Sequence, residues 1–167
     1  MNNDKSEEKF NKNVKQLTEQ FKETYKKAFF DLLEQKVAAD PPDYEWIARL
    51  YNEIRVKLTS ILRKGSHFRN EIEEHIDTEL FKQMNKNKAF QPTDLYNLVN
   101  YTFNVCKKMG SPGRDKETDE KKQEIIDLVN SGNATFANVV PLYIKNINHC
   151  VDYIYEDLHG VAQLLKK

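Results

Sequence analysis

The sequence predicts an all-α, single-domain bundle of about six helices, in which the first and last helices are long. Three observations favour this fold class. Only five glycines and five prolines occur among 167 residues, which disfavours a turn-rich β architecture. Apolar side chains recur every three or four positions through most of the chain, as they do on one face of a helix. Lys, Glu, Leu and Gln, which all favour helix, are plentiful.

The first expected element is a long amphipathic helix from Ser6 to about Ala39. Its apolar residues form one stripe: Phe10, Val14, Leu17, Phe21, Tyr25, Ala28 and Leu32. We expect this helix either to lie across the rest of the chain or to extend beyond it and pack on a partner. The chain therefore divides into an N-terminal helix, residues 1–40, and a helical core, residues 41–167.

Prolines at positions 41 and 42 end the first helix, because proline lacks an amide donor and disfavours helix in the residue before it. A second helix is expected after the capping residue Asp43, ending near Lys64 with Gly65 as a left-handed C-cap. A third helix is expected to run without interruption over residues 68–84, because apolar side chains recur there at intervals of four.

The C-terminal half of the chain predicts three more helices. The fourth is expected to begin at the N-cap Thr93 and to end at Gly110. A turn-rich loop then leads to a charged fifth helix over residues 117–130. Asn133 is the expected cap of a long last helix, and Pro141 should either kink that helix or lie in its first turns.

Composition limits the partners that the chain can be expected to bind. The 26 basic and 26 acidic residues balance, so we expect no nucleic acid as a partner. No stretch of about 18 apolar residues occurs, so we expect no membrane insertion. The N-terminus also lacks an apolar leader, and a cytoplasmic location is the corresponding expectation.

Signatures of catalytic, cofactor and metal sites are missing from the sequence. The four histidines include no i, i+4 pair, and the two cysteines lack metal-ligand spacing. Glycine-rich phosphate loops and nucleophile elbows are absent as well. Two cysteines are also too few for a disulfide framework. We therefore expect no enzyme, no cofactor and no bound metal.

Four spaced signatures within residues 41–115 resemble one family. In order, they are Pro41-Pro42-Asp43-Tyr44, Glu53-Ile54-Arg55, Arg69-x-x-Ile72-x-Glu74-x-Ile76-Asp77 and Cys106 followed by Pro112-x-Arg114-Asp115. This order resembles the N-terminal portion of the t-complex protein eleven family of eukaryotic regulators, of which the chain looks like a short, truncated member. The resemblance implies a helical scaffold, and it implies the family's link to cyclic-AMP and protein kinase A signalling rather than a catalytic reaction.

The candidate site consists of charged residues inside this resemblance: Glu53, Arg55, Arg69, Asp77, Arg114 and Asp115. Arginine binds a carboxylate through two hydrogen bonds of defined geometry, so we expect Arg114 to dock on an acid such as Asp77 or Glu53. The alternatives are a solvated surface and a contact to a partner. A second basic group is expected either to contact an anion or acidic peptide or to remain hydrated around its turn: Arg63, Lys64 and His67.

These patterns together predict a non-enzymatic protein-interaction module, which would act as a signalling adaptor or regulator on one or more protein partners. The alternative is a structural or scaffold subunit of a larger assembly, such as a viral or cytoskeletal one. In that case the long first helix and the aromatic last helix would supply interfaces. A scaffold should form a homo-oligomer, whereas a regulator can be monomeric.

Overall fold

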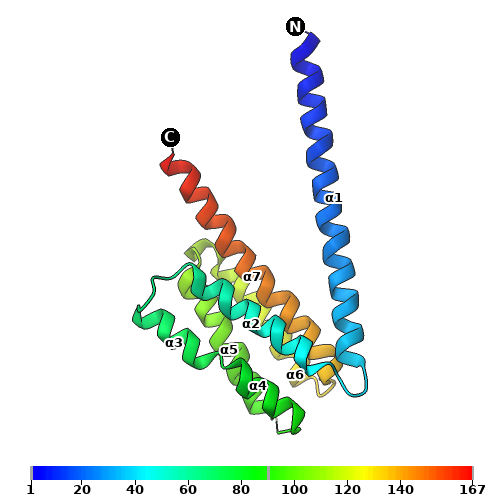
Figure 1. Cartoon of the computed structure of the whole chain (residues 1–167), viewed down its shortest axis with the longest axis vertical. Coiled ribbons are helices and arrows are strands. Elements are labelled where there is room, and N and C mark those ends of the chain that lie inside the picture. The colour runs from blue at the N-terminus through cyan, green and yellow to red at the C-terminus, as the bar shows by residue number, and fades with distance from the viewer. Residues whose placement is uncertain (1, 90, 167) are drawn as a thin grey trace.

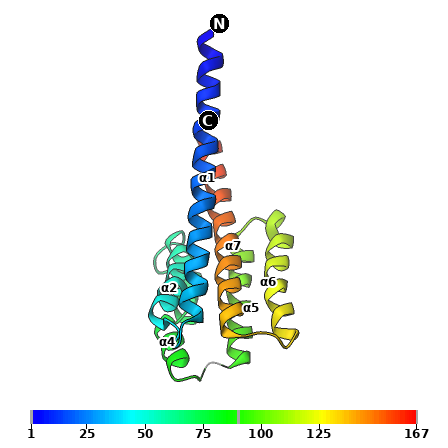
Figure 2. The ribbon, with the colours of Figure 1, turned by 90° about the vertical axis from the view of Figure 1, so that its right-hand side faces the viewer.

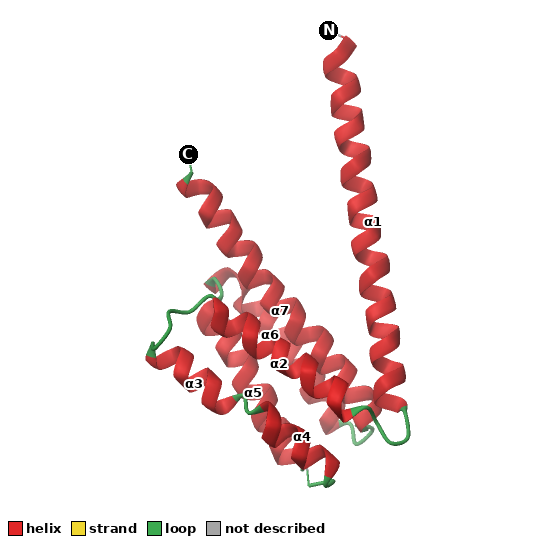
Figure 3. Ribbon diagram, viewed as in Figure 1, coloured by secondary structure: helices red, strands yellow, loops and turns green. Residues whose placement is uncertain are grey.

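The computed structural model describes residues 2–89 and 91–166, and Figure 1 shows their arrangement. The elements in order are α1 (Asn2–Ala38), α2 (Tyr44–Ser60), α3 (His67–His75), α4 (Thr78–Lys86), α5 (Pro92–Met109), the 3-10 helix η1 (Pro112–Arg114), α6 (Asp115–Asn130) and α7 (Phe136–Leu165). These residues include no β-strand (Figure 3). The prediction of an all-α bundle with long first and last helices is confirmed.

The last helix, α7, is the centre of the bundle, because it packs against α1, α2, α5 and α6 (Figure 2). Helices α3 and α4 pack against α2 on its other side. Six helices, α1, α2, α3, α5, α6 and α7, each contribute a completely buried side chain to the common core: Leu33, Ile54, Ile72, Phe103, Ile125 and Ile147. This burial of apolar surface is the main stabilising contribution to the bundle.

Only the C-terminal part of α1 belongs to the bundle. There, Leu33 and Val37 are buried, and Phe29 is partly buried against the core. The N-terminal part of α1 projects beyond the other helices, and the end of α7 projects from the same end of the bundle (Figures 1 and 2). We call these two projections the α1 arm, residues 2–27, and the α7 arm, residues 158–165.

The prediction of one uninterrupted helix over residues 68–84 is wrong, because the chain divides into α3 and α4 at Ile76 and Asp77. Ile76 leaves the helical conformation, with φ −94° and ψ 74°, and its side chain is completely buried. The carboxylate of Asp77 accepts a hydrogen bond of 3.0 Å from the backbone amide of Leu80 and thereby caps α4. Asp competes with the backbone for such hydrogen bonds and so favours caps over helix interiors.

Replacing Asp77 with Ala is expected to lower the free energy of unfolding by about 1 kcal/mol, because the first amides of α4 lose their acceptor. Urea denaturation followed by circular dichroism measures this difference. The matched variant is Asp77→Asn, which retains a capping oxygen and should lose much less stability. Equal losses in the two variants would contradict the capping role and would point to the charge of Asp77 instead.

Two further helix boundaries, the end of α2 and the start of α5, lie at other residues than expected. Helix α2 ends at Ser60, about one turn early, and Gly65 has its positive φ of 77° in the turn that follows. Helix α5 begins at Pro92, after the N-cap Gln91, so that Thr93 is not the cap. Proline suits the first helical position because the amide that it lacks would have no partner there.

The N-terminus of α7 is capped by Thr135 rather than by Asn133. The Thr135 hydroxyl accepts a hydrogen bond of 3.3 Å from the amide of Asn138, and the Asn138 side chain accepts one of 2.7 Å from the amide of Thr135. This reciprocal capping box satisfies two amides at once. Pro141 lies in the second turn of α7 and is buried, which agrees with the expected position near the helix start.

Candidate functional site

Two arginines of the predicted set tie α2 to the helix pair that follows it. The guanidinium of Arg55 donates to the carbonyl oxygen of Ile76 over 3.5 Å. The guanidinium of Arg69 donates to the carbonyl oxygen of Leu62 over 3.1 Å and pairs with the carboxylate of Glu73, also over 3.1 Å. Both carbonyls lie outside regular helix, where the backbone needs another donor. These two arginines therefore stabilise the turns on either side of α3.

Arg114 is the last residue of η1, and its side chain reaches α7. Its guanidinium carbon lies 4.2 Å from the centre of the Tyr153 ring. Its amino groups lie 3.4 Å from a carboxylate oxygen of Asp157, 3.5 Å from one of Glu156 and 3.6 Å from one of Glu117. The hydrogen bond to Asp157 raises the pKa of Arg114 above its usual value. A planar guanidinium can stack on the ring and pair with carboxylates at the same time.

The expected docking of Arg114 on Asp77 or Glu53 is wrong. Asp77 caps α4, and Glu53 lies on the exposed side of α2. The arginine instead lies beside α6 and α7, because η1 packs on α6 and the guanidinium reaches the neighbouring α7. Its partner Asp157 is 43 residues further along the chain.

Replacing Arg114 with Ala is expected to lower the melting temperature, because three carboxylates would then face one another without a cation. Arg114→Lys should recover only part of this loss, since an ammonium cannot stack on Tyr153 as a guanidinium does. Thermal unfolding followed by circular dichroism measures both. The control is Arg63→Ala, because Arg63 is an exposed arginine in the α2–α3 turn. A melting temperature unchanged by Arg114→Ala would contradict a structural role.

The remaining predicted residues lie apart from one another. Asp115 begins α6, where a carboxylate interacts favourably with the helix dipole. Glu53 lines a groove beside α1. Arg63, Lys64 and His67 are exposed around the turn between α2 and α3. Arg55, Arg69, Asp77 and Arg114 thus stabilise separate junctions, and the structure does not gather the predicted charged residues into one site.

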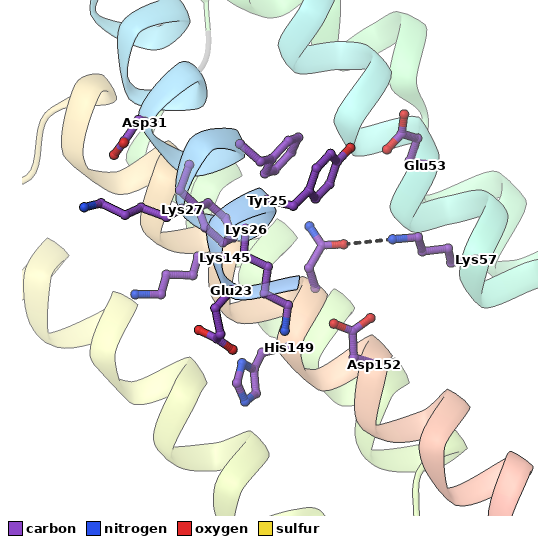
Figure 4. A pocket seen from close by; sticks show the side chains of 13 residues that line it. Glu23, Tyr25, Lys26, Lys27, Asp31, Glu53, Lys57, Lys145, His149 and Asp152 are labelled. Carbon is purple, nitrogen blue, oxygen red and sulfur yellow. Dashed lines mark hydrogen bonds between the residues drawn. The ribbon is translucent and has the colours of Figure 1, made fainter. Parts of the chain in front are cut away.

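An open groove of about 650 Å³ lies between α1, α2 and α7 (Figure 4). Acidic and basic side chains come from all three helices, including Glu23 and Lys26, Glu53 and Lys57, and Asp152 and His149. The ammonium of Lys57 lies 3.4 Å from the side-chain oxygen of Asn148, which links α2 to α7 across the groove. Its balanced charges give the groove no preference for an anionic or a cationic ligand.

His149 lines the groove, and its surroundings lower its pKa. Burial lowers its pKa, and the nearby cations Lys121 and Lys26 lower it further. Its Nε2 atom lies 2.8 Å from the hydroxyl of Tyr153. The neutral imidazole is therefore favoured, and it forms a hydrogen bond that joins successive turns of α7.

The apolar stripe predicted on α1 does not face the core. All of its members are exposed, and we call them the α1 stripe: Phe10, Val14, Leu17, Phe21, Tyr25, Ala28 and Leu32. The apolar residues that do pack on the bundle are Phe29, Phe30, Leu33 and Val37. At 3.6 residues per turn, these four lie on a different face of the helix from the stripe. The intervals of four between Phe29, Leu33 and Val37 were the sequence signal for the face of α1 that contacts the bundle.

A second exposed apolar line extends the core-facing side of α7 past the end of the bundle. Val151 and Ile154 are buried, whereas the next residues on this side are 45%, 54% and 83% exposed: Leu158, Val161 and Leu165. Intervals of three and four keep all five residues on one face. We call the three exposed residues the α7 stripe.

Both cysteines, Cys106 and Cys150, are buried free thiols. Burial raises the pKa of Cys106 and raises that of Cys150 to about 11. A thiol with a raised pKa stays protonated near neutral pH, and the protonated thiol reacts slowly with oxidants and electrophiles.

Among residues 2–89 and 91–166, no cluster of three His, Cys, Asp or Glu side chains is arranged to hold a metal ion. The helices described also include none with the length and apolar character that crossing a membrane requires.

Comparisons with known proteins agree with the resemblance seen in the sequence. A family model described as T-complex protein 11 matches residues 5–154. The human T-complex protein 11 homolog is 36% identical over 109 residues, which cover 65% of this chain and 21% of that protein. The human T-complex protein 11-like X-linked protein 1 is 34% identical over 110 residues, again covering 65% and 21%. The rat T-complex protein 11 homolog is 26% identical over 148 residues, covering 88% and 25%.

No solved structure matches the chain. The chain spans about a quarter or less of the length of these curated relatives. The family match begins within α1, well before the signatures of residues 41–115, and ends at the last buried residue of α7, Ile154. Because this match covers nearly the whole bundle, the chain belongs to the T-complex protein 11 family.

Proposed function

We propose that this chain is a non-enzymatic protein-interaction module that serves as an adaptor or regulator. The observation that supports this proposal is the pair of exposed apolar stripes on α1 and α7. Both lie on helices that project from one end of the bundle (Figure 1). Exposed apolar surface bordered by polar residues is a common mark of a protein contact.

The α7 stripe has the geometry of a helix that docks into the apolar groove of a partner. Leu158, Val161 and Leu165 occupy positions i, i+3 and i+7, which are the anchor positions in helix-in-groove recognition. Burying a leucine or valine side chain contributes about 1.5–3 kcal/mol. Three such anchors supply a sizeable share of the energy of a micromolar complex, about 8 kcal/mol.

Binding rather than catalysis is the proposed activity, because the sequence carries no nucleophile, metal or cofactor signature. We also propose that the protein acts in the cytoplasm, since two buried free thiols suit a reducing compartment. The scaffold alternative would use the same two stripes and differs in the stoichiometry of the assembly.

The test is an affinity pull-down from an extract of the source cells, with light scattering on the recovered complex to measure its stoichiometry. Wild-type chain is expected to retain a stoichiometric protein partner, and the double variant Leu158→Asp with Val161→Asp is expected to lose it. The matched control changes charge equally away from the stripe, through Gln163→Asp on the arm with Lys166→Gln at the C-cap of α7. Retention of the same partner by all three chains would remove the α7 stripe from the proposal.

A further inference from the structure

We propose that the α1 stripe is the interface of an antiparallel homodimer, in which two α1 helices pair about a two-fold axis near Phe21. This inference rests on the proposed protein-interaction role, and it names a second copy of the chain as one partner. The α7 stripe lies on a different helix and is not part of this interface.

The α1 stripe is uncovered along its full length. Phe10 is 67% exposed on the arm, and Leu32 is still 41% exposed beside the bundle, although its neighbour Leu33 is completely buried. From Phe10 to Leu32 the stripe is about 33 Å long, at about 1.5 Å per residue. The bundle therefore packs on one face of α1 and leaves the α1 stripe exposed, with Tyr25 at the edge of the groove between α1, α2 and α7.

The spacing of the stripe favours antiparallel pairing. Its members follow at intervals of 4, 3, 4, 4, 3 and 4 residues, an order that is the same from either end. This is an 11-residue repeat of about 3.67 residues per turn, so the stripe runs nearly straight along the helix. An axis at Phe21 then brings each member opposite another: Phe10 opposite Leu32, Val14 opposite Ala28, Leu17 opposite Tyr25, and Phe21 opposite its own copy.

The polar borders of the stripe suit a second copy better than a charged partner. Asn11 and Thr18 flank it on one side, and Asn13 and Gln20 flank it on the other, by their positions on the helix. Lys22 and Asp31, which follow Asn11 and Gln20 by one 11-residue repeat, continue these two borders, and the other charged residues of 8–27 lie on the remaining face. Amides and hydroxyls both donate and accept, so two identical borders can bond to each other without repulsion. With one charge of each sign, the borders carry no net charge that would attract a charged partner.

The position of the bundle also favours the antiparallel arrangement. Each bundle lies at the C-terminal end of its own α1 (Figure 1). Antiparallel pairing places the two bundles at opposite ends of the dimer, and the arm of one copy then lies along the exposed Leu32 side of the other. Parallel pairing would bring both bundles to the same end. The two-fold arrangement buries the same surface on both copies, as a closed dimer requires.

The exposed area of the stripe is large enough for a stable pair. Phe10, Phe21 and Tyr25 are 67%, 72% and 74% exposed. An aromatic side chain carries about 150–250 Å², so these three present roughly 400 Å² per copy and twice that in a pair. The aliphatic members raise the total beyond the roughly 1,000 Å² that a specific interface buries.

Size-exclusion chromatography with light scattering tests the dimer. Wild-type chain is expected to have twice the chain mass at micromolar concentration, and the double variant Leu17→Glu with Phe21→Glu is expected to be a monomer. Both side chains are more than half exposed, so the substitutions should leave the bundle folded. The matched control, Lys12→Gln with Gln16→Glu, changes the charge equally on the other face and should remain a dimer. A monomeric wild type would overturn the proposal, as would a control that dissociates like the stripe variant.

Disulfide cross-linking under mild oxidation tests the orientation. Phe21→Cys places a thiol at the two-fold axis and is expected to give a covalent dimer. Phe10→Cys is expected to remain unlinked, because its counterpart lies at the far end of the partner helix. Glu19→Cys, on the charged face, is the background control, and the native cysteines are buried. Equal cross-linking of Phe10→Cys and Phe21→Cys indicates a parallel pair and overturns the antiparallel arrangement, as does failure of Phe21→Cys to cross-link.

The two proposals fail separately. A monomeric wild type that still retains a partner through the α7 stripe overturns the homodimer and leaves the protein-interaction role in place. A wild-type dimer that retains no other protein supports the homodimer and favours the scaffold alternative over an adaptor. Flotation of a monomeric wild type with anionic vesicles would assign the α1 stripe to a membrane surface and overturn the homodimer.

Discussion

Replacing Phe103 with Ala is expected to lower the free energy of unfolding by about 3–5 kcal/mol, which is a large fraction of the stability of a domain of this size. Phe103 is completely buried on α5, and its ring centre lies 6.3 Å from that of Tyr143 on α7, in an edge-to-face arrangement. Removing the ring leaves a cavity between these two helices as well as losing apolar burial. Urea denaturation followed by circular dichroism measures the loss.

The matched control for this prediction is Tyr96→Ala. Tyr96 is an aromatic residue on the same helix, and it is 53% exposed. Both substitutions exchange an aromatic residue for the best helix former, so they differ mainly in burial. The exposed substitution should change stability by about 0.5 kcal/mol or less. Similar losses at the two positions would show that α5 does not pack on α7 as described.

Stability is expected to fall steeply above about pH 10, because two buried tyrosines resist ionisation in the folded chain. Burial raises the pKa of Tyr51 and of Tyr143 well above the ordinary value of 10. The unfolded chain therefore releases protons that the folded chain retains. The stabilising contribution is complete below pH 10 and is lost as the pH rises from there toward the folded-state pKa. Each tyrosine gives a slope of about 1.4 kcal/mol per pH unit.

Urea denaturation at several pH values between about 8 and 11 tests this expectation. The double variant Tyr51→Phe with Tyr143→Phe should lose the part of the slope that these two phenols give, while the buried thiols of Cys106 and Cys150 keep their part in every variant. Tyr96→Phe, at an exposed position, should keep the wild-type slope. The hydroxyl of Tyr143 donates a hydrogen bond of 3.0 Å to the hydroxyl of Thr102. Its loss costs about 1 kcal/mol at every pH, which changes the level of the curve but not its slope. An unchanged slope in the double variant would contradict the burial of these phenols.

Features that depend on a few neighbouring residues were predictable from the sequence. Helical periodicity indicated most of the helices, and the Asp43 cap and the proline break before α2 were located correctly. The division between α3 and α4 was not predictable from periodicity, because the spacing of apolar residues continues through it. Asp77, at the break, was a usable signal, since Asp prefers caps.

Contacts between distant residues were much less predictable. Arg114 was identified as a residue that joins a loop to a helix, but its acids lie on α6 and α7 rather than on α2 or at the start of α4. A guanidinium pairs with any carboxylate within reach, so the packing of η1 decides the partner. The charged groove between α1, α2 and α7 likewise arises only when three separate segments come together.

The sequence by itself determined that the chain is all-α, that α1 is amphipathic and that the signatures of residues 41–115 resemble one family. Only the tertiary structure decided which face of α1 is buried. Helix α1 carries two apolar lines, and α2 and α7 cover the shorter one, with Leu33 and Val37, while the longer α1 stripe stays exposed. Periodicity reports that a helix has an apolar face, but the position of its neighbours decides whether the chain itself or another molecule covers that face.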